Sequence, residues 1–388
     1  ARLAEYHRSI DEESIKLKNA VAEHAKKAPT PPASKVQSLA ESAKPRSTHV
    51  LIRGDFQRPG DEVTPHTLSV LHPLSTASGQ PSRVDLASWL VDPANPLTAR
   101  VTVNRMWLYL FGRGLVPSIG DFGTRGEKPS HPELLDWLAS ELVARGWSQK
   151  TMIKEIVCSA TYRQASRFRA ELAERDPNNV WLARQTRMRL EAEVLRDVFL
   201  ASSGLLVPRI GGPSVHPAQP AGISELTYAG SAKWVESKGA DRYRRGMYTW
   251  FQRTSPYPML MTFDAPDSNV CCVRRERSDT PLQALTLLND AVFVECAQAL
   301  GRRIIEESGC SSTSERIQYA FRLCLARDPS SEELSILTRS YEALLKQFQA
   351  NPESAAQLAG TSHEPAETAA WIAIGRTLLN LDEFVTRE

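Results

Sequence analysis

Apolar residues recur at helical spacing through most of the chain after residue 82. A clear case is Leu134, Leu135, Leu138 and Leu142, which fall on one face of a helix that ends at Gly146. The same three- and four-residue spacing predicts a series of further helices. We expect them at residues 82–90, 98–111, 148–157, 188–203, 280–307, 314–326, 330–348 and 366–381.

Two capping boxes indicate where helices begin. Ser130 stands three residues before Glu133, and Ser330 stands three residues before Glu333. In this motif the serine and glutamate side chains each satisfy a free backbone N–H of the first helical turn. Pro281 likewise marks the start of what we expect to be a single long helix, because proline suits the first helical position.

Three segments interrupt the helical pattern. Residues 48–56 alternate enough for a short strand closed by turn residues, and residues 246–252 are strand-like. Residues 204–240 carry many Gly and Pro and few helical signals, which indicates a long loop region with a hairpin as one option. The predicted fold class is therefore mainly α, a multi-helical body with a few short strands and long irregular loops.

Residues 1–47 differ from the rest of the chain. A polar helix with sparse apolar positions is followed by a Pro- and Ser-rich stretch typical of a linker. We expect the tail of an upstream region, or alternatively a frayed N-terminal helix docked on the body. Because the chain begins at Ala1 without Met, we expect a processed product or a fragment. The remainder is expected to form one domain, with a core at 48–300 and a C-terminal helical part at 301–388.

Composition limits the function. The 388 residues carry 47 Lys and Arg against 45 Asp and Glu, a net charge of +2, which argues against binding nucleic acid by bulk electrostatics. No apolar run has the length of a transmembrane segment. None of the six cysteines forms a CxxC or CxxCH motif, so we expect no zinc ribbon, no metal site and no covalently bound cofactor in this chain.

The strongest candidate for binding chemistry is a basic and aromatic segment at residues 241–277. It holds seven arginines against four acids, with Tyr, Trp and Phe interleaved. Arginine forks suit carboxylates, sulfates and phosphates, and aromatic faces suit sugars and flat cofactors. Alternatively, these arginines satisfy internal carboxylates such as Asp264, Glu193 and Asp197. The candidate ligand-binding residues are Arg105, Arg163, Arg245, Arg253, Arg274, Arg275 and Trp250.

Two further residues are candidates for catalysis. His216 lies in a Gly- and Pro-rich loop and is a candidate ligand or acid, or else an ordinary loop histidine. Asp264 is a candidate base or ligand within FDAPDSN, although Asp264, Asp267 and Asn269 more readily form a turn than a calcium site. Because the chain has no GxSxG, HExxH or P-loop motif, whether it is an enzyme stays open.

Several long runs of sequence are shared with one family. They include LIRGDFQRPGDEVTP, NPLTARVTVNRMWLYLFGRGLV, SATYRQAS, YRRGMYTWFQRTSPYPMLMTFDAP and LLNLDEF. In these runs the chain resembles the planctomycete PSD1 family, also called domain of unknown function 1553. It departs from the family at Asp279, where members usually have Asn, and at Cys272, where they usually have a small or hydroxyl residue.

The resemblance implies an architecture. Such proteins typically carry an upstream cytochrome c-like domain and a second domain of unknown function, 1549, and look exported to the periplasm or cell envelope. Haem c is then expected on an upstream or partner domain. The implied function is a redox-associated, electron-transfer-linked module that binds an anionic or sugar-like ligand such as a polysaccharide. The alternatives are a non-catalytic scaffold that packs against those partner domains, or a glycan-binding module.

The arrangement of three arginines distinguishes these functions. If Arg245, Arg274 and Arg275 converge on an open pocket with His216 or Asp264, binding or catalysis is favoured. If each arginine is buried against an acid, a scaffold is favoured.

Overall fold

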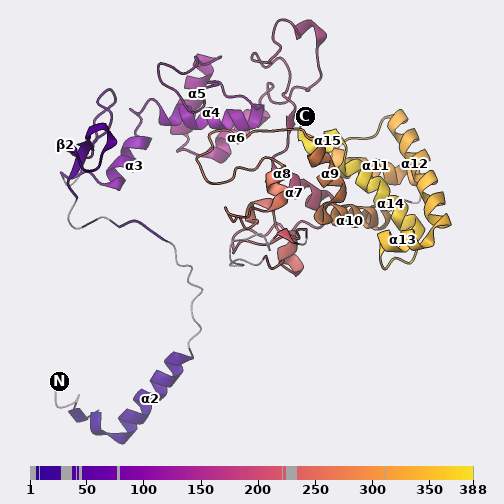
Figure 1. Cartoon of the computed structure of the whole chain (residues 1–388), viewed down its shortest axis with the longest axis horizontal. Coiled ribbons are helices and arrows are strands. Elements are labelled where there is room, and N and C mark those ends of the chain that lie inside the picture. Colours follow the sequence, from indigo (N-terminus) through magenta and orange to yellow (C-terminus); the bar gives the residue numbers. More distant parts are fainter. Residues whose placement is uncertain are drawn as a thin grey trace. The chain divides into compact units, whose positions relative to one another are not determined.

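The computed structural model describes residues 6–7, 9–27, 37–40, 42, 46–76, 79–220, 222–223, 234–310 and 312–387. The described chain is mainly helical, with two short two-stranded sheets (Figure 1), which confirms the predicted fold class. It divides into two compact units between Asp92 and Pro93. No helix in the described part of the chain is long and apolar enough to span a membrane.

The first unit begins with the polar helix α2 (Glu12–Lys26). Asp11 caps it by accepting a hydrogen bond from the backbone N–H of Ser14, and none of its residues is buried. Capping rather than packing therefore stabilises this helix. Most of the predicted linker lies outside the described residues.

A hairpin and one helix complete the first unit. Strands β1 (Thr48–Leu51) and β2 (Pro59–Val63) pair antiparallel. The strand predicted for 48–56 ends early, because the chain turns at Arg53, which has a φ of 54°. Helix α3 (Arg83–Val91) begins with a capping box.

The second unit starts with a cluster of three helices, α4 (Thr98–Phe111), α5 (Pro132–Ala144) and α6 (Gln149–Cys158). Their apolar stripes form one core around Trp107 and Leu138. The predicted capping box at Ser130 is wrong. His131 is the N-cap of α5, and the Ser130 hydroxyl instead donates to the Leu115 carbonyl.

Helix α7 (Ala192–Ser202) starts later than the helix predicted for 188–203. Met188–Arg189 forms strand β3, which pairs antiparallel with β4 (Thr386–Arg387) at the end of the chain. Local periodicity gave no sign of this pairing, because its partner lies almost 200 residues away in the sequence.

The C-terminal helices form the largest apolar core. The long helix predicted for 280–307 is two helices, because Asp290 is extended (ψ 136°) and its side chain caps the second. A further helix lies between the helices predicted for 330–348 and 366–381, where none was expected; Asn351 caps it, and it buries Ala355 and Ala359. The helices are α8 (Pro258–Thr262), α9 (Pro281–Asn289), α10 (Ala291–Glu307), α11 (Thr313–Leu325), α12 (Ser331–Ala350), α13 (Pro352–Ala359), α14 (Pro365–Leu379) and α15 (Asp382–Val385).

The segment before α8 is irregular. The strand predicted for 246–252 is wrong, since Gly246–Tyr248 forms a short 3₁₀ helix and only isolated bridges join Val207 to Arg244 and Val215 to Thr249. Gly246 approaches the backbone of Glu193 in α7 so closely that a Cβ atom there would lie 2.5 Å from the Glu193 carbonyl oxygen. This close contact, rather than strand pairing, fixes the course of the chain.

Candidate ligand-binding cleft

Arg275 in the basic segment is paired with acids at the start of α7. Its Nη1 and Nη2 atoms donate to the two carboxylate oxygens of Glu193 at 2.6 and 3.1 Å, and Nη1 lies 3.2 Å from Glu191. Arg277 also pairs with Glu191, at 3.1 Å. The hydrogen bond to Glu193 raises the pKa of Arg275. The structure thus places Arg275 on Glu193 rather than on Asp264.

Arg245 is paired as well. Its Nε atom donates to Asp197 of α7 at 2.7 Å, and the backbone N–H of Gly246 donates to the other carboxylate oxygen at 2.6 Å. Arg242 and the hydroxyl of Tyr243 both donate to Glu295 of α10. These contacts join the basic segment to α7 and α10, so much of its charge is neutralised inside the protein.

Arg244 is buried with no carboxylate beside it among the described residues. Its exposed fraction is 0%, and its guanidinium lies 3.7 Å from the centre of the Tyr248 ring. It donates to the carbonyls of Pro213, at 2.8 Å, of Arg209, at 3.2 Å, and of Gly211. The Gly211 N–H donates in turn to the Tyr248 hydroxyl. Arg244 therefore holds the glycine-rich loop in place through its carbonyl oxygens.

His216 and Trp250 lie together in an aromatic cluster. The His216 ring lies edge-on to Trp234 at 4.7 Å and stacks against Trp250 at 5.8 Å, and Trp234 stacks on Tyr257. Burial lowers the pKa of His216, which favours the neutral imidazole at pH 7. The indole N–H of Trp234 donates to the Pro217 carbonyl, which fixes the cluster to the loop.

Asp264 closes a turn. Its carboxylate accepts hydrogen bonds from the backbone N–H and hydroxyl of Ser278, both at 2.8 Å, and from the amide of Gln283 at 3.3 Å. Its own backbone is left-handed, with a φ of 60°. These contacts fasten the chain just before α9. Asp279, one of the two departures from the family pattern, pairs with Arg189 at 2.9 Å.

Arg274 differs from its neighbours because its nearest ion-pair partner, Glu276, is 3.8 Å away and its side chain is 56% exposed. It lines a polar cleft of about 500 Å³ against the loop that follows α4. A smaller pocket of about 230 Å³ shares Leu108, Gly112 and Arg274 with this cleft. The polar side chains that line the cleft include Arg113, Glu127, Ser130, Asn178, Thr186 and Arg274.

Two glycines shape the loop that bears Arg113. Gly112 ends α4 with a φ of 79°, and a Cβ atom on it would lie 2.5 Å from the Met188 sulfur. A Cβ atom on Gly114 would lie 2.8 Å from the amide of Asn104, which is buried and hydrogen-bonds both backbone polar groups of Val116. The Gly-Arg-Gly sequence is thus a turn, and it exposes Arg113 at the cleft.

The remaining predicted residues lie apart from these contacts. Arg105, Arg163 and Arg253 are exposed, and the structure shows no ion pair for them with any described residue. Sequence reasoning missed Arg113, whose only signal was its position between two glycines in a loop. No group of three or more potential metal ligands occurs among the described residues, and all six cysteines are free.

Comparison with known proteins identifies the family. No curated protein and no solved structure gives a significant match. The family model of PSD1, described as a protein of unknown function (DUF1553), matches residues 82–341, which is more than half of the chain. The matched range includes the cleft, the basic segment and the aromatic cluster. The chain therefore belongs to the PSD1 family.

Proposed function

We propose that this PSD1 chain is a binding module whose polar cleft takes an anionic or sugar-like ligand. The observation that supports the proposal is the exposed position of Arg274 at the cleft, where no acid is closely paired with it among the described residues. Its neighbours Arg275 and Arg277 are paired with Glu193 and Glu191 at the start of α7, whereas Arg274 lines an open cleft together with Arg113.

The lining suits such a ligand. Two arginine forks bind a carboxylate or sulfate, and Ser130, Asn178 and Thr186 supply donors and acceptors for hydroxyl groups. The cleft volume lies within the range of about 300–1,000 Å³ that is usual for small-molecule sites. Glu127 also lines the cleft and favours a ligand that carries hydroxyl donors.

A scaffold role is the second candidate function. Its support is the pairing of Arg245 and Arg275 with Asp197 and Glu193, since these pairs tie the basic segment to a helix of the body. Attachment to a cytochrome c-like domain and to a 1549-type domain, export and redox chemistry stay predictions from the resemblance.

The test is a binding titration of the whole chain against glucuronate, galactose 6-sulfate and glucose. We expect the two anionic sugars to bind more tightly than glucose. R274Q and R113Q should each weaken their binding by about tenfold, the effect of losing one charge-assisted hydrogen bond. R253Q is the matched control, because Arg253 is exposed and lies outside the cleft lining. Equal affinities for wild type, R274Q and R113Q would rule out the cleft as the site.

A further inference from the structure

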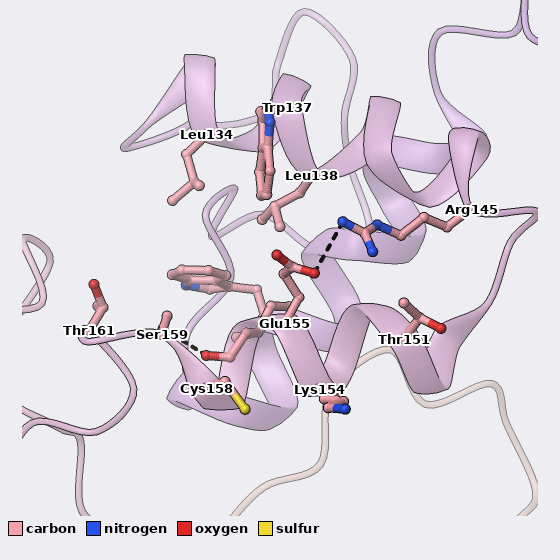
Figure 2. A pocket seen from close by; sticks show the side chains of 12 residues that line it. Leu134, Trp137, Leu138, Arg145, Thr151, Lys154, Glu155, Cys158, Ser159 and Thr161 are labelled. Carbon is pink, nitrogen blue, oxygen red and sulfur yellow. Dashed lines mark hydrogen bonds and ion pairs between the residues drawn. The ribbon is translucent and has the colours of Figure 1, made fainter.

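A second concave site lies on the helical cluster of α4, α5 and α6, separate in its lining from the polar cleft apart from Trp107. Figure 2 shows Trp137, Leu134 and Leu138 pointing from α5 toward α6, with Glu155 and Cys158 on the facing helix. The volume of this groove is about 620 Å³.

The groove has an apolar interior and one exposed aromatic wall. Trp107, Leu138 and Ile156 are buried and belong to the core of the cluster. Trp137 is 48% exposed although it lies on the same helix face as Leu134 and Leu138. An indole ring left half in water beside buried apolar side chains gains free energy when another apolar surface covers it.

The charges at the edge of the groove offset one another. Arg145 donates to Glu141 at 2.9 Å and lies 3.2 Å from Glu155, so its charge is balanced twice. Lys154 is exposed and forms no ion pair with the residues that the structure describes. A ligand that is neutral, or that carries at most one anionic group, therefore complements the groove. Burying more charge against groups that are already paired is costly.

We propose that this groove binds a small planar molecule that is mainly apolar, with an aromatic ring system lying against Trp137. The size supports a small ligand, since pockets that take organic molecules are mostly apolar, hold a few polar groups and enclose about 300–1,000 Å³. A macromolecular partner requires a larger surface, about 800 Å² from each side of a stable interface. This site is independent of the anion cleft in its chemistry and in its test.

The probe is 8-anilinonaphthalene-1-sulfonate, which combines a planar apolar body with one negative charge. Its fluorescence is titrated with the whole chain of wild type, W137A and W181A. Trp181 is the matched control, because it is 65% exposed on the same unit but does not line the groove. We expect W137A to weaken binding at least about fivefold and W181A to leave it within about twofold.

A second measurement does not depend on a variant. Cys158 lines the groove and is exposed, whereas Cys271 and Cys272 are exposed but belong to a different segment. In the reduced wild-type protein, saturating probe should slow alkylation of Cys158 by iodoacetamide and leave the rates at the other two cysteines unchanged. This result decides the question if W137A does not fold.

Three outcomes would overturn the proposal. One is unchanged probe affinity in a folded W137A protein. Another is equal alkylation of Cys158 with and without probe. The third is concentration-dependent dimerisation that W137A abolishes, since the groove would then be covered by a second copy of the chain.

Discussion

The loop region between Gly204 and Trp250 and the C-terminal helices α10–α14 are stabilised by different means. In the helices, close apolar packing brings α10 and α14 into contact at Gly301 and Ile372. In the loop region, the described residues are held by polar side chains, above all the buried Arg244, which donates to backbone carbonyls. The helices thus depend on close apolar packing, and the loop region depends on side-chain hydrogen bonds that take the place of secondary structure.

The comparison shows what an arginine does in different settings. Arg244 is buried, and its guanidinium donates hydrogen bonds to backbone carbonyl oxygens. Arg275 is paired with two acids, and Arg274 lies exposed at a cleft. Arg196 resembles Arg244, because it is buried and donates to the Arg242 carbonyl at 2.7 Å, and burial lowers its pKa. The residue type alone therefore does not distinguish a structural arginine from one that binds a ligand.

The largest expected effect is in the apolar region. A Cβ atom at Gly301 would lie 2.6–2.8 Å from Cγ1, N and Cα of Ile372, and two of these are backbone atoms that cannot move aside. We expect G301A to lower the free energy of unfolding by about 3 kcal/mol. Denaturant unfolding of the whole chain measures this.

Gly375 in α14 supplies the control for that substitution. The atoms nearest to a Cβ atom there would be two side-chain carbons of Leu300, at 3.3 and 3.4 Å, and the carbonyl oxygen of Ala297, at 3.6 Å. G375A should stay within about 1 kcal/mol of wild type, because alanine favours the helix and offsets the tight contact. Equal losses in G301A and G375A would mean that close packing at Ile372 does not stabilise the region.

The next effect is in the loop region. R244M removes three hydrogen bonds to carbonyls and the contact with Tyr248, so we expect a loss of about 2 kcal/mol. R209Q breaks an exposed pair with Asp241 and should cost about 0.5 kcal/mol or less. Denaturant unfolding measures both variants. A larger loss of unfolding free energy from R209Q than from R244M would show that the buried Arg244 is not the main support of the loop region.

Sequence reasoning succeeded where the physical signal is local. The apolar stripes of the helices and the capping box at Ser330 predicted most of the helical body. It failed where an element depends on a partner that is distant in the sequence, or where the element is too short to show a periodic pattern. Asp290 divides one expected helix in two through its own backbone conformation, and α13 has too few apolar residues to show a stripe.

The candidate site was less predictable for the same reason. The basic segment was recognised, and Glu193 and Asp197 were named as alternative internal partners, which the structure confirms for Arg275 and Arg245. Which acid pairs with which arginine does not follow from periodicity, because Glu193 lies 82 residues from Arg275 in the sequence. The carbonyl partners of Arg244 have no residue pattern at all. Arg113 joins Arg274 only through the folded course of two loops.

A smaller effect separates the two adjacent arginines of the basic segment. R275M removes the partner of Glu193 and one of the two partners of Glu191, which keeps Arg277, and we expect it to cost about 1–2 kcal/mol. R274M should cost about 0.5 kcal/mol or less, because Arg274 is exposed and not closely paired. Thermal unfolding and anion binding should thus respond to different variants. If R274M destabilises as much as R275M, Arg274 is structural and the cleft loses its main support.

The smallest effect depends on pH and lies on the surface of the apolar region. Arg327 donates to both carboxylate oxygens of Glu333, at 2.9 and 2.7 Å, and its hydrogen bonds lower the pKa of Glu333 from 4.5 to about 2. Because the folded pKa is the lower one, the stabilisation is complete above pH 4.5 and is lost as the pH falls toward 2. The Glu333 side chain is 36% exposed, so solvent screening limits its contribution to about 1 kcal/mol.

E333Q should therefore flatten the acid limb of the stability curve between about pH 5 and pH 2. At pH 7 it should lower the free energy of unfolding only by the contribution of Glu333, about 1 kcal/mol. E342Q is the control on α12, since Glu342 is exposed and forms no ion pair among the described residues. Unfolding curves collected at steps of pH compare the slopes. An acid limb in E333Q as steep as that of E342Q would show that the Arg327–Glu333 pair contributes no pH-dependent stability, because the pair of Arg327 with Glu383 is unchanged in this variant. In that case this surface pair would add nothing to the apolar packing of the helices, and the contrast with the loop region would become sharper.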